Sequence, residues 1–226
     1  MATLRRFLKA FHGSSIPTLC ETDDGAVCVI KLHGAGNGPE SMISEYVVNR
    51  IASAAGLPVP PPLIVDLPAD YPWNFGTDEF FDIVRKSGGP NLGLAYLGDT
   101  KPLPCDAYAS VSPALIAQVV TLDLIFSNVD RRCASGNLLQ DDRGQAWIVD
   151  HGSCRFLHRE SPSSQLTPGH AFTGSEHLRN PQLLPPVSPR FLEAIVGDLP
   201  DPWLRGAAIT REHVARRIAA CCGRPD

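Results

Sequence analysis

The sequence predicts an α+β fold in which short strands come first and helices follow. Three observations lead to this prediction. β-prone runs flank a turn at residues 22–25, an apolar stripe at helical spacing runs from 115 to 126, and β-prone runs flank a second turn at 141–144. A chain of 226 residues fits one domain, which two lobes can make up.

The N-terminal part predicts a hairpin, a glycine-rich loop and a helix, in that order. The hairpin covers residues 18–32, and three glycines lie in the loop at 34–38. A helical stretch follows from about 40 to 55. It must end at Gly56 and the proline cluster at 58–62.

Two segments have less regular patterns. Residues 1–12 carry apolar side chains at helical spacing, which predicts an amphipathic helix. Residues 68–104 contain many prolines and glycines, which break any long element and predict a loop-rich stretch.

The second half of the chain predicts a long helix, a hairpin and two further helices. Ser112 and Pro113 form a strong helix start, with an N-cap side chain followed by proline in the first turn. A hairpin covers about 137–149. In the tail, helices are expected over about 189–196 and after Thr210.

Composition excludes several classes of protein. The net charge of -4 and the pI of about 6.0 do not fit an overall nucleic-acid binder. No apolar run is long enough to span a bilayer. The seven cysteines are widely spaced and form no CxxC, which argues against a disulfide framework and a zinc site and favours a reducing, cytoplasmic setting.

Two aspartates and an asparagine stand out in the second half. The long helix leads to Asp130, the hairpin ends at Asp150, and Asn137 lies between them. Phosphoryl transfer needs one carboxylate to orient the attacking hydroxyl, and a second carboxylate with an amide oxygen to hold Mg²⁺. Taken singly, each residue is equally typical of a helix end or a turn.

The first half offers a matching lysine and glutamate. A kinase requires a strand lysine that grips the α- and β-phosphates and a helical glutamate that orients this lysine. Lys31 interrupts the apolar run 27–32, and Glu45 lies in the following helix. The alternative for Lys31 is an edge or snorkelling lysine.

Other catalytic signatures do not occur in the sequence. The glycine-rich loop has neither the GKS/T of a Walker A loop nor a GxGxxG before the helix. No HExxH and no GxSxG is present, which argues against zinc proteases and hydrolases with a nucleophile elbow. His151 is expected to help hold its loop, and His170 is expected at the surface.

With these residues in place, the sequence resembles the HipA-like kinases, specifically their short stand-alone bacterial group. That family is distantly related to the phosphatidylinositol 3- and 4-kinases and to protein kinases. The matching stretches are residues 29–32, 44–46, 56–60, 128–132, 137–139 and 148–152.

The resemblance implies a single kinase-like domain over residues 1–226 with a bilobal protein-kinase-like fold. A small β-rich N-lobe would cover about 1–67, a connecting segment about 68–111 and a mainly helical C-lobe about 112–226. ATP would lie between the lobes. The start of the chain would be a strand, in contrast to the helix that its periodicity predicts.

The resemblance also implies roles for the candidate residues. Lys31 would hold phosphates and pair with Glu45, Asp130 would be the catalytic base, and Asp150 would ligate Mg²⁺. The family's metal-binding asparagine follows the aspartate by five residues, and here that position is Ser135. Either Asn137 takes over this role or activity is reduced.

The implied activity is ATP- and Mg²⁺-dependent transfer of the γ-phosphate to a hydroxyl, with a protein serine or threonine as acceptor. An antitoxin-like protein partner is a further implication of the resemblance. Two alternatives stay open: a pseudokinase that acts by binding a partner, and a small-molecule kinase of the antibiotic phosphotransferase type.

Overall fold

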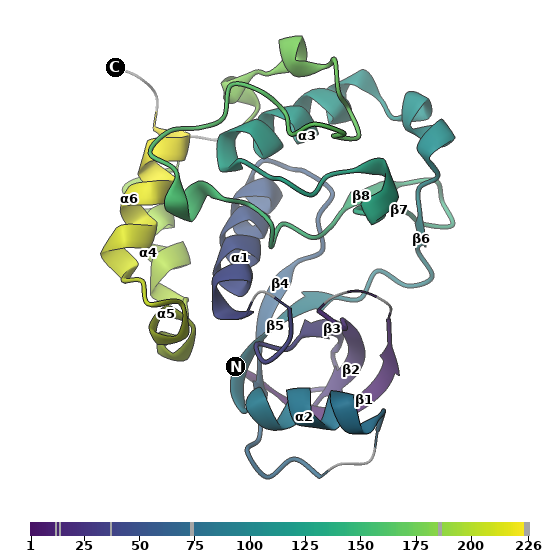
Figure 1. Ribbon diagram of the computed structural model, residues 1–226, viewed down its shortest axis with the longest axis vertical. Helices are drawn as coiled ribbons and strands as arrows, with labels where there is room; N and C mark the ends of the chain where they lie inside the picture. Colours follow the sequence, from purple (N-terminus) through teal and green to yellow (C-terminus); the bar gives the residue numbers. More distant parts are fainter. Residues whose placement is uncertain (12, 14, 37, 73–74, 185–186, 224–226) are drawn as a thin grey trace.

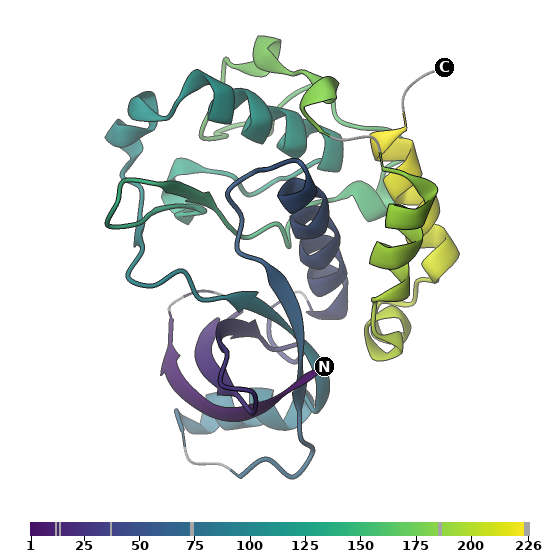
Figure 2. The same cartoon turned by 180° about the vertical axis from the view of Figure 1, so that it is seen from behind.

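The computed structural model describes residues 1–223 other than 12, 14, 37, 73, 74, 185 and 186, and it shows two lobes (Figure 1). A closed five-stranded barrel forms one lobe, and helices form most of the other. Figure 2 shows from behind that helix α1 (Gly38–Ala54) lies between the barrel and helix α3 (Pro113–Phe126). The predicted α+β class and the bilobal arrangement are confirmed.

The barrel has the strand order β1-β2-β3-β5-β4, and β1 closes it by pairing parallel to β4. Its core is apolar and separate from that of the helical lobe, and helix α2 (Asp78–Lys86) adds Phe80 and Val84 to it. The strand bounds are β1 Ala2–Ala10, β2 Thr18–Thr22, β3 Val27–Lys31, β4 Pro62–Leu67 and β5 Gly89–Ala95. The predicted hairpin is β2–β3, so this prediction is confirmed.

Strand β1 corrects the helix predicted from the periodicity of residues 1–12. Its pairing with β2 shifts register between Leu4 and Arg6 and again between Phe7 and Lys9. Each irregularity adds a residue to one strand, which changes the spacing of inward-facing side chains from two to three. Leu4 and Phe7 therefore both face the barrel core, and a strand displays a spacing that is typical of a helix.

Strand β5 was not expected, because it lies within the stretch predicted to be loop-rich. It carries a proline and two glycines, which are unfavourable in strands. Gly93 is required by close packing: a Cβ there would meet Val65 Cγ2 at 2.9 Å and Leu63 Cδ2 at 3.0 Å, both from the neighbouring strand β4. The glycine that weakens the sequence signal is the residue that lets these two strands approach.

The helical lobe contains α3, α4 (Pro189–Gly197), α5 (Asp201–Ala207) and α6 (Arg211–Cys222). Helix α1 shares the apolar core of this lobe. A small sheet of β6 (Lys101–Pro102), β7 (Leu138–Gln140) and β8 (Ala146–Ile148) completes it. The predicted hairpin and the two predicted tail helices are confirmed, and α5 was not predicted.

The start and the end of α3 follow from local chemistry. The Ser112 side chain accepts a hydrogen bond from Leu115 N, Pro113 lies in the first turn, and Ser127 ends the helix in the left-handed conformation with φ 54°. Every residue from Val119 to Phe126 is buried, including Asp123. The second half of α3 therefore lies inside the lobe and is buried on all sides, whereas the sequence predicted one apolar face.

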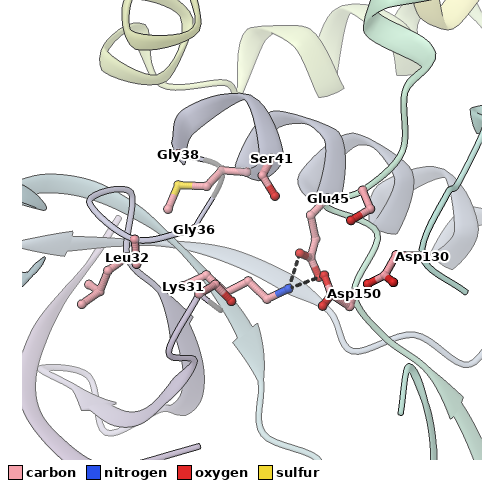
Figure 3. Close-up of a pocket in the computed structure, with 12 residues that line it drawn as sticks. Lys31, Leu32, Gly36, Gly38, Ser41, Glu45, Asp130 and Asp150 are labelled. Atoms are coloured by element: carbon pink, nitrogen blue, oxygen red, sulfur yellow. Dashed lines mark hydrogen bonds and ion pairs between the residues drawn. The ribbon is translucent and has the colours of Figure 1, made fainter. Parts of the chain in front are cut away.

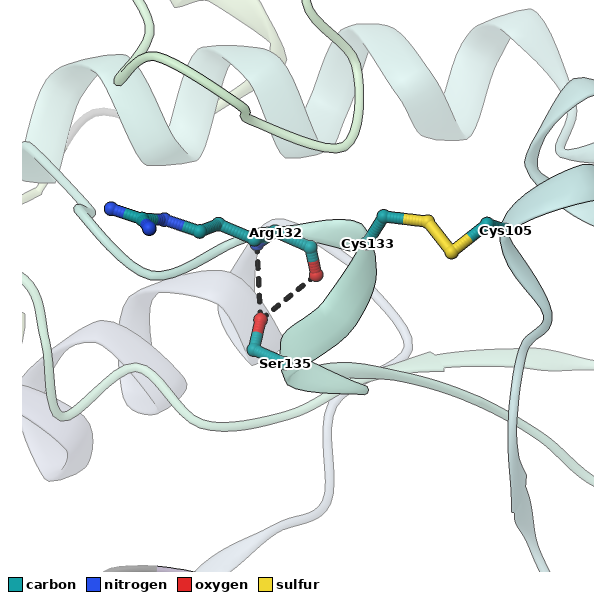
Figure 4. Close-up of a disulfide and its surroundings, with 4 residues drawn as sticks. All are labelled: Cys105, Arg132, Cys133 and Ser135. Carbon is teal, nitrogen blue, oxygen red and sulfur yellow. Dashed lines mark hydrogen bonds between the residues drawn. A yellow bond between two sulfur atoms is a disulfide. The ribbon is translucent and has the colours of Figure 1, made fainter.

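One disulfide corrects the interpretation of the cysteines. Cys105 and Cys133 are bonded, with their Cα atoms 5.5 Å apart (Figure 4). Cys105 begins the 3₁₀ turn η1 (Cys105–Ser110). Cys133 begins the 3₁₀ turn η2 (Cys133–Ser135), three residues after Asp130. The other five cysteines are free.

Among the residues that the structure describes, no helix combines the length and the apolar character needed to cross a membrane.

We predict that the Cys105–Cys133 bond stabilises the helical lobe. It joins residues 28 positions apart, and constraining a loop of that size in the unfolded chain is worth about 3 kcal/mol. Reductant should lower the urea midpoint of the wild type, whereas Cys105→Ser should already have the lower midpoint and not respond to reductant. Equal midpoints for reduced and oxidised wild type would contradict the prediction.

Candidate active site

Three charged side chains from distant parts of the chain meet between the lobes (Figure 3). Lys31 is the last residue of β3, Glu45 lies in the second turn of α1, and Asp150 follows β8. Lys31 Nζ donates hydrogen bonds to Glu45 Oε2 at 2.5 Å and to Asp150 Oδ1 at 2.9 Å. The structure thus brings together three of the residues singled out in the sequence.

The cluster is held by mutual neutralisation of buried charge. The side chains of Lys31, Glu45 and Asp150 are 14%, 1% and 42% exposed. Burial alone would lower the pKa of Lys31, but the two carboxylates outweigh burial and raise this pKa. Burial would raise the pKa of Asp150, and the Lys31 charge overcomes this effect and lowers it. Lys31 and Asp150 are therefore both charged at neutral pH.

Gly152 allows the loop after β8 to pack directly against α1. A Cβ at this position would overlap the Ser41 hydroxyl and would lie 3.4 Å from Glu45 Oε2. Any other residue at this position would require the Ser41 side chain or the loop itself to shift. The glycine that follows Asp150 by two residues is thus what brings the Asp150 backbone beside the helix that carries Glu45.

Asp150 itself has a left-handed backbone conformation, with φ 61°. This conformation is unfavourable for most side chains, although aspartate tolerates it better than bulky residues. Backbone hydrogen bonds hold the loop on both sides, from Val149 N to Asn137 O and from Cys154 N to His151 O. The surrounding structure therefore imposes the direction in which Asp150 presents its carboxylate.

Asp130 lies in the loop after α3, and its carboxylate lines the same cavity as Lys31 and Asp150. Its backbone is held at both ends. Asp130 N donates to Asn128 Oδ1 at 3.0 Å, and Asp130 O accepts from Ser135 Oγ at 2.6 Å and from Asn137 Nδ2 at 2.9 Å. Among the described residues, no cation lies within ion-pair distance of the carboxylate.

The two candidates for the metal-binding amide position differ in what their side chains do. The Ser135 hydroxyl bonds backbone groups of its own turn, namely Asp130 O, Arg132 O and Arg132 N (Figure 4). Asn137 uses Nδ2 to bond Asp130 O, while no donor in the described part of the chain bonds its Oδ1. Asn137 thus has a carbonyl oxygen available, whereas Ser135 closes the turn.

A buried polar cluster behind the site was not foreseen. Asp123 accepts hydrogen bonds from Arg131 Nε at 2.9 Å, His170 Nε2 at 3.0 Å and Asn128 Nδ2 at 2.8 Å. His170 is only 4% exposed, which corrects its expected surface position. The signal that could have revealed the cluster is Asp123 itself, because an aspartate in the most apolar stretch of a helix needs a buried partner.

Residues of both lobes line the cavity at the site. Leu32 and Gly36 border it on the barrel side, Met42 on α1 and Ser153 on the opposite loop (Figure 3). Its volume of about 60 Å³ holds a few water molecules or a hydrated ion. Pockets for drug-sized ligands typically have volumes of roughly 300–1,000 Å³, so this cavity is smaller than a typical ligand pocket.

Among the described residues, no group of three histidine, cysteine or acidic side chains could hold a metal ion. A magnesium site here therefore has to rely on one or two carboxylates together with amide, water or phosphate oxygens.

The comparisons with known proteins agree with this geometry. The family model described as HipA-like kinase matches residues 5–184, which is most of the chain. The chain belongs to the HipA-like kinase family. No curated protein matches it.

The chain is similar to two solved structures, of which the first supports the fold. The chain is similar to the proinflammatory kinase CtkA of Helicobacter pylori, with 12% identity, 96% of each chain covered and a TM-score of 0.54. It also matches the MAP kinase LmaMPK10 of Leishmania major, with 15% identity, 69% of this chain and 47% of that chain covered, and a TM-score of 0.28. The first likeness shows that the kinase fold extends over nearly the whole chain.

We predict that Lys31→Met destabilises the protein in a pH-dependent way. The substitution leaves Glu45 buried without its cation, which should cost about 3–5 kcal/mol at neutral pH. Glu45 must then bind a proton in the folded state, so its folded pKa lies above its unfolded pKa and stability is lost as pH rises. Urea unfolding at pH 5.5 and pH 8 measures this difference.

The control is the double variant Lys31→Met/Glu45→Leu. It removes both buried charges, so it should recover most of the lost stability. It should also lack the pH dependence that the single variant owes to Glu45. A single variant that is as stable as wild type at pH 8 would show that the ion pair does not compensate the burial of Glu45.

Proposed function

We propose that this chain is an ATP- and Mg²⁺-dependent phosphotransferase that transfers the γ-phosphate to a hydroxyl, with a protein serine or threonine as acceptor. One observation carries the proposal: the Lys31–Glu45 pair, Asp150 and Asp130 all line one cavity between the lobes. A phosphate grip, a metal ligand and a base are the groups that phosphoryl transfer requires.

Lys31 and Glu45 form the phosphate grip in this proposal. The Lys31 ammonium is charged, lies at the edge of the barrel and is held by Glu45 Oε2. When phosphates are present, Lys31 can exchange its contact with Asp150 for phosphate oxygens and keep its contact with Glu45. Glu45 then sets the direction of the ammonium, which is the positioning contribution to catalysis.

Asp150 and Asn137 are the proposed metal ligands. A carboxylate oxygen and an amide carbonyl oxygen are the donor types that Mg²⁺ prefers, and Asn137 Oδ1 is available whereas the Ser135 hydroxyl bonds its own turn. When bound, Mg²⁺ supplies neutralisation of the phosphate charge. In this proposal Asn137, and not Ser135, takes the role of the metal-binding asparagine.

Asp130 is the proposed catalytic base. Its carboxylate faces the cavity, and its backbone is held by Asn128, Ser135 and Asn137. A carboxylate without a bound cation can accept a hydrogen bond from the acceptor hydroxyl and take its proton as the phosphoryl group moves.

The second candidate function is a kinase-like binding module that acts through a protein partner of the antitoxin type. The small volume of the cavity, about 60 Å³, is the observation that favours it. The charged cluster favours catalysis instead, because a scaffold has no use for a buried lysine bonded to two carboxylates. Small-molecule acceptors are a variant of the main proposal with the same chemistry.

Thermal unfolding with ATP separates these functions. At ATP about a hundredfold above its dissociation constant, binding adds about 2.7 kcal/mol of stability, which corresponds to a rise of roughly 5–10 °C in Tm. We expect this rise with ATP plus Mg²⁺ and a smaller one with ATP plus EDTA. Asp150→Asn should remove the Mg²⁺-dependent part.

Asp201→Asn is the matched control for this measurement, because Asp201 also bonds a basic side chain, Arg211, but lies on α5 away from the cavity. It should keep the full rise. No rise for wild type at millimolar ATP would contradict the proposal and support the binding module.

Substitution of the base tests the chemical step alone. Asp130→Asn should lower the rate of γ-phosphate transfer by about 10²–10⁴-fold, because the hydroxyl proton loses its acceptor. The Mg²⁺·ATP-dependent rise in Tm should persist. The rate is measured as loss of labelled γ-phosphate to water or to a serine-rich test protein, and a rate equal to wild type would exclude Asp130 as the base.

A further inference from the structure

Arg131 is a fully buried arginine, 1% exposed, that directly follows the proposed base Asp130. An arginine side chain has five N–H groups. Here each has a partner: Nε bonds Asp123 Oδ2 at 2.9 Å, Nη2 bonds Asp123 Oδ1 at 3.3 Å and His151 Nδ1 at 3.2 Å, and Nη1 bonds the carbonyls of Asn137 and Val149, both at 2.8 Å.

These partners flank the proposed metal ligands. Val149 and His151 are the two neighbours of Asp150, and the Asn137 carbonyl belongs to the other proposed ligand. A single rigid guanidinium therefore contacts the backbone or side chains around both ligands and is covalently adjacent to Asp130.

The guanidinium is itself anchored on one side. Asp123 neutralises the charge of the guanidinium, and the pKa of Asp123 is lowered because Arg131 and His170 outweigh the effect of burial. Phe172 N donates to His170 Nδ1, so His170 Nε2 carries the proton that it donates to Asp123. Asp123 on helix α3 therefore holds the guanidinium in place, and from there Arg131 bonds the carbonyls of Asn137, before β7, and Val149, after β8.

His151 completes this arrangement as a neutral acceptor. His151 is fully buried. Burial, and to a smaller extent the nearby charge of Arg131, lowers the pKa of His151 to about 3. Its Nδ1 accepts from Arg131, and its Nε2 has no partner among the described residues. Among the described residues, Arg131 is thus the only one that forms a hydrogen bond with this side chain.

We propose that Arg131 is a positioning residue that sets the distance between Asp150 and Asn137 and thereby the affinity of the site for Mg²⁺. The inference rests on the proposed function, because it presupposes that these two residues hold the metal. Groups that orient metal ligands typically change metal affinity by 10–100-fold when they are removed. Lysine cannot replace this arginine, because one ammonium cannot reach Asp123 and both carbonyls.

The test measures binding of Mg²⁺ to the protein in the presence of saturating ATP, by calorimetry and by the Mg²⁺-dependent rise in Tm. Arg131→Lys is expected to raise the Mg²⁺ concentration for half-saturation by about 10–100-fold. It should change the affinity for ATP in EDTA far less. A merely structural role would lower the baseline Tm and leave the Mg²⁺ half-saturation unchanged.

Arg217→Lys is the matched control. Arg217 is also a buried arginine, 8% exposed, and it bonds a backbone carbonyl, Phe156 O, at 3.0 Å. It lies on α6, outside the contacts of the site. Arg217→Lys should lower the baseline Tm without changing the Mg²⁺ half-saturation.

A second pair of variants keeps the test valid if Arg131→Lys does not fold. His151→Leu removes the acceptor for Arg131, whereas His151→Asn can place its Oδ1 near the position of Nδ1. We expect weaker Mg²⁺ binding in His151→Leu and partial or full recovery in His151→Asn. Equal Mg²⁺ affinity for wild type and His151→Leu would overturn the positioning role.

The two proposals fail in different ways. If wild type shows no Mg²⁺-dependent ATP binding, the proposed function is wrong and the inference falls with it. If wild type binds Mg²⁺·ATP and every variant at positions 131 and 151 binds Mg²⁺ as tightly, only the positioning role is excluded.

Discussion

The arrangement of the site depends on the contact of one buried ammonium with two carboxylates. Lys31 comes from the barrel, Glu45 from α1 and Asp150 from the loop after β8, and neither Lys31 nor Glu45 could stay buried as a charge without its partner. This requirement links segments up to 119 residues apart in the chain. It also explains why the surrounding backbone accepts an unfavourable conformation at Asp150 and a glycine at position 152, since both bring the carboxylate within reach of the lysine.

The sequence predicted the features that depend on local patterns. The β2–β3 hairpin, the capped start of α3 and the hairpin before Asp150 follow from turns, caps and periodicity, and Lys31 and Glu45 stand out because charge is unusual in their apolar surroundings. Features that depend on tertiary pairing were missed. The bulges in β1 change its spacing, Gly93 makes β5 look like a loop, and neither the Cys105–Cys133 bond nor the partners of Arg131 leave a sequence spacing that could reveal them.

Two charged clusters of different character lie back to back. The first, around Lys31, borders the cavity and can exchange a partner, because Asp150 is 42% exposed. The second, around Asp123 and Arg131, is buried, and every N–H group of the Arg131 guanidinium donates a hydrogen bond within the protein. The proposed exchange of partners at Lys31 would therefore leave the backbone that Arg131 holds in place.

Helix α1 connects two barrel strands along the chain, yet its side chains belong to the core of the helical lobe. Glu45 and Asp150 are therefore carried by the same body, and Lys31 alone is carried by the barrel. Any rotation of the barrel relative to the helical lobe would therefore have to break the contacts of Lys31 with both carboxylates at once.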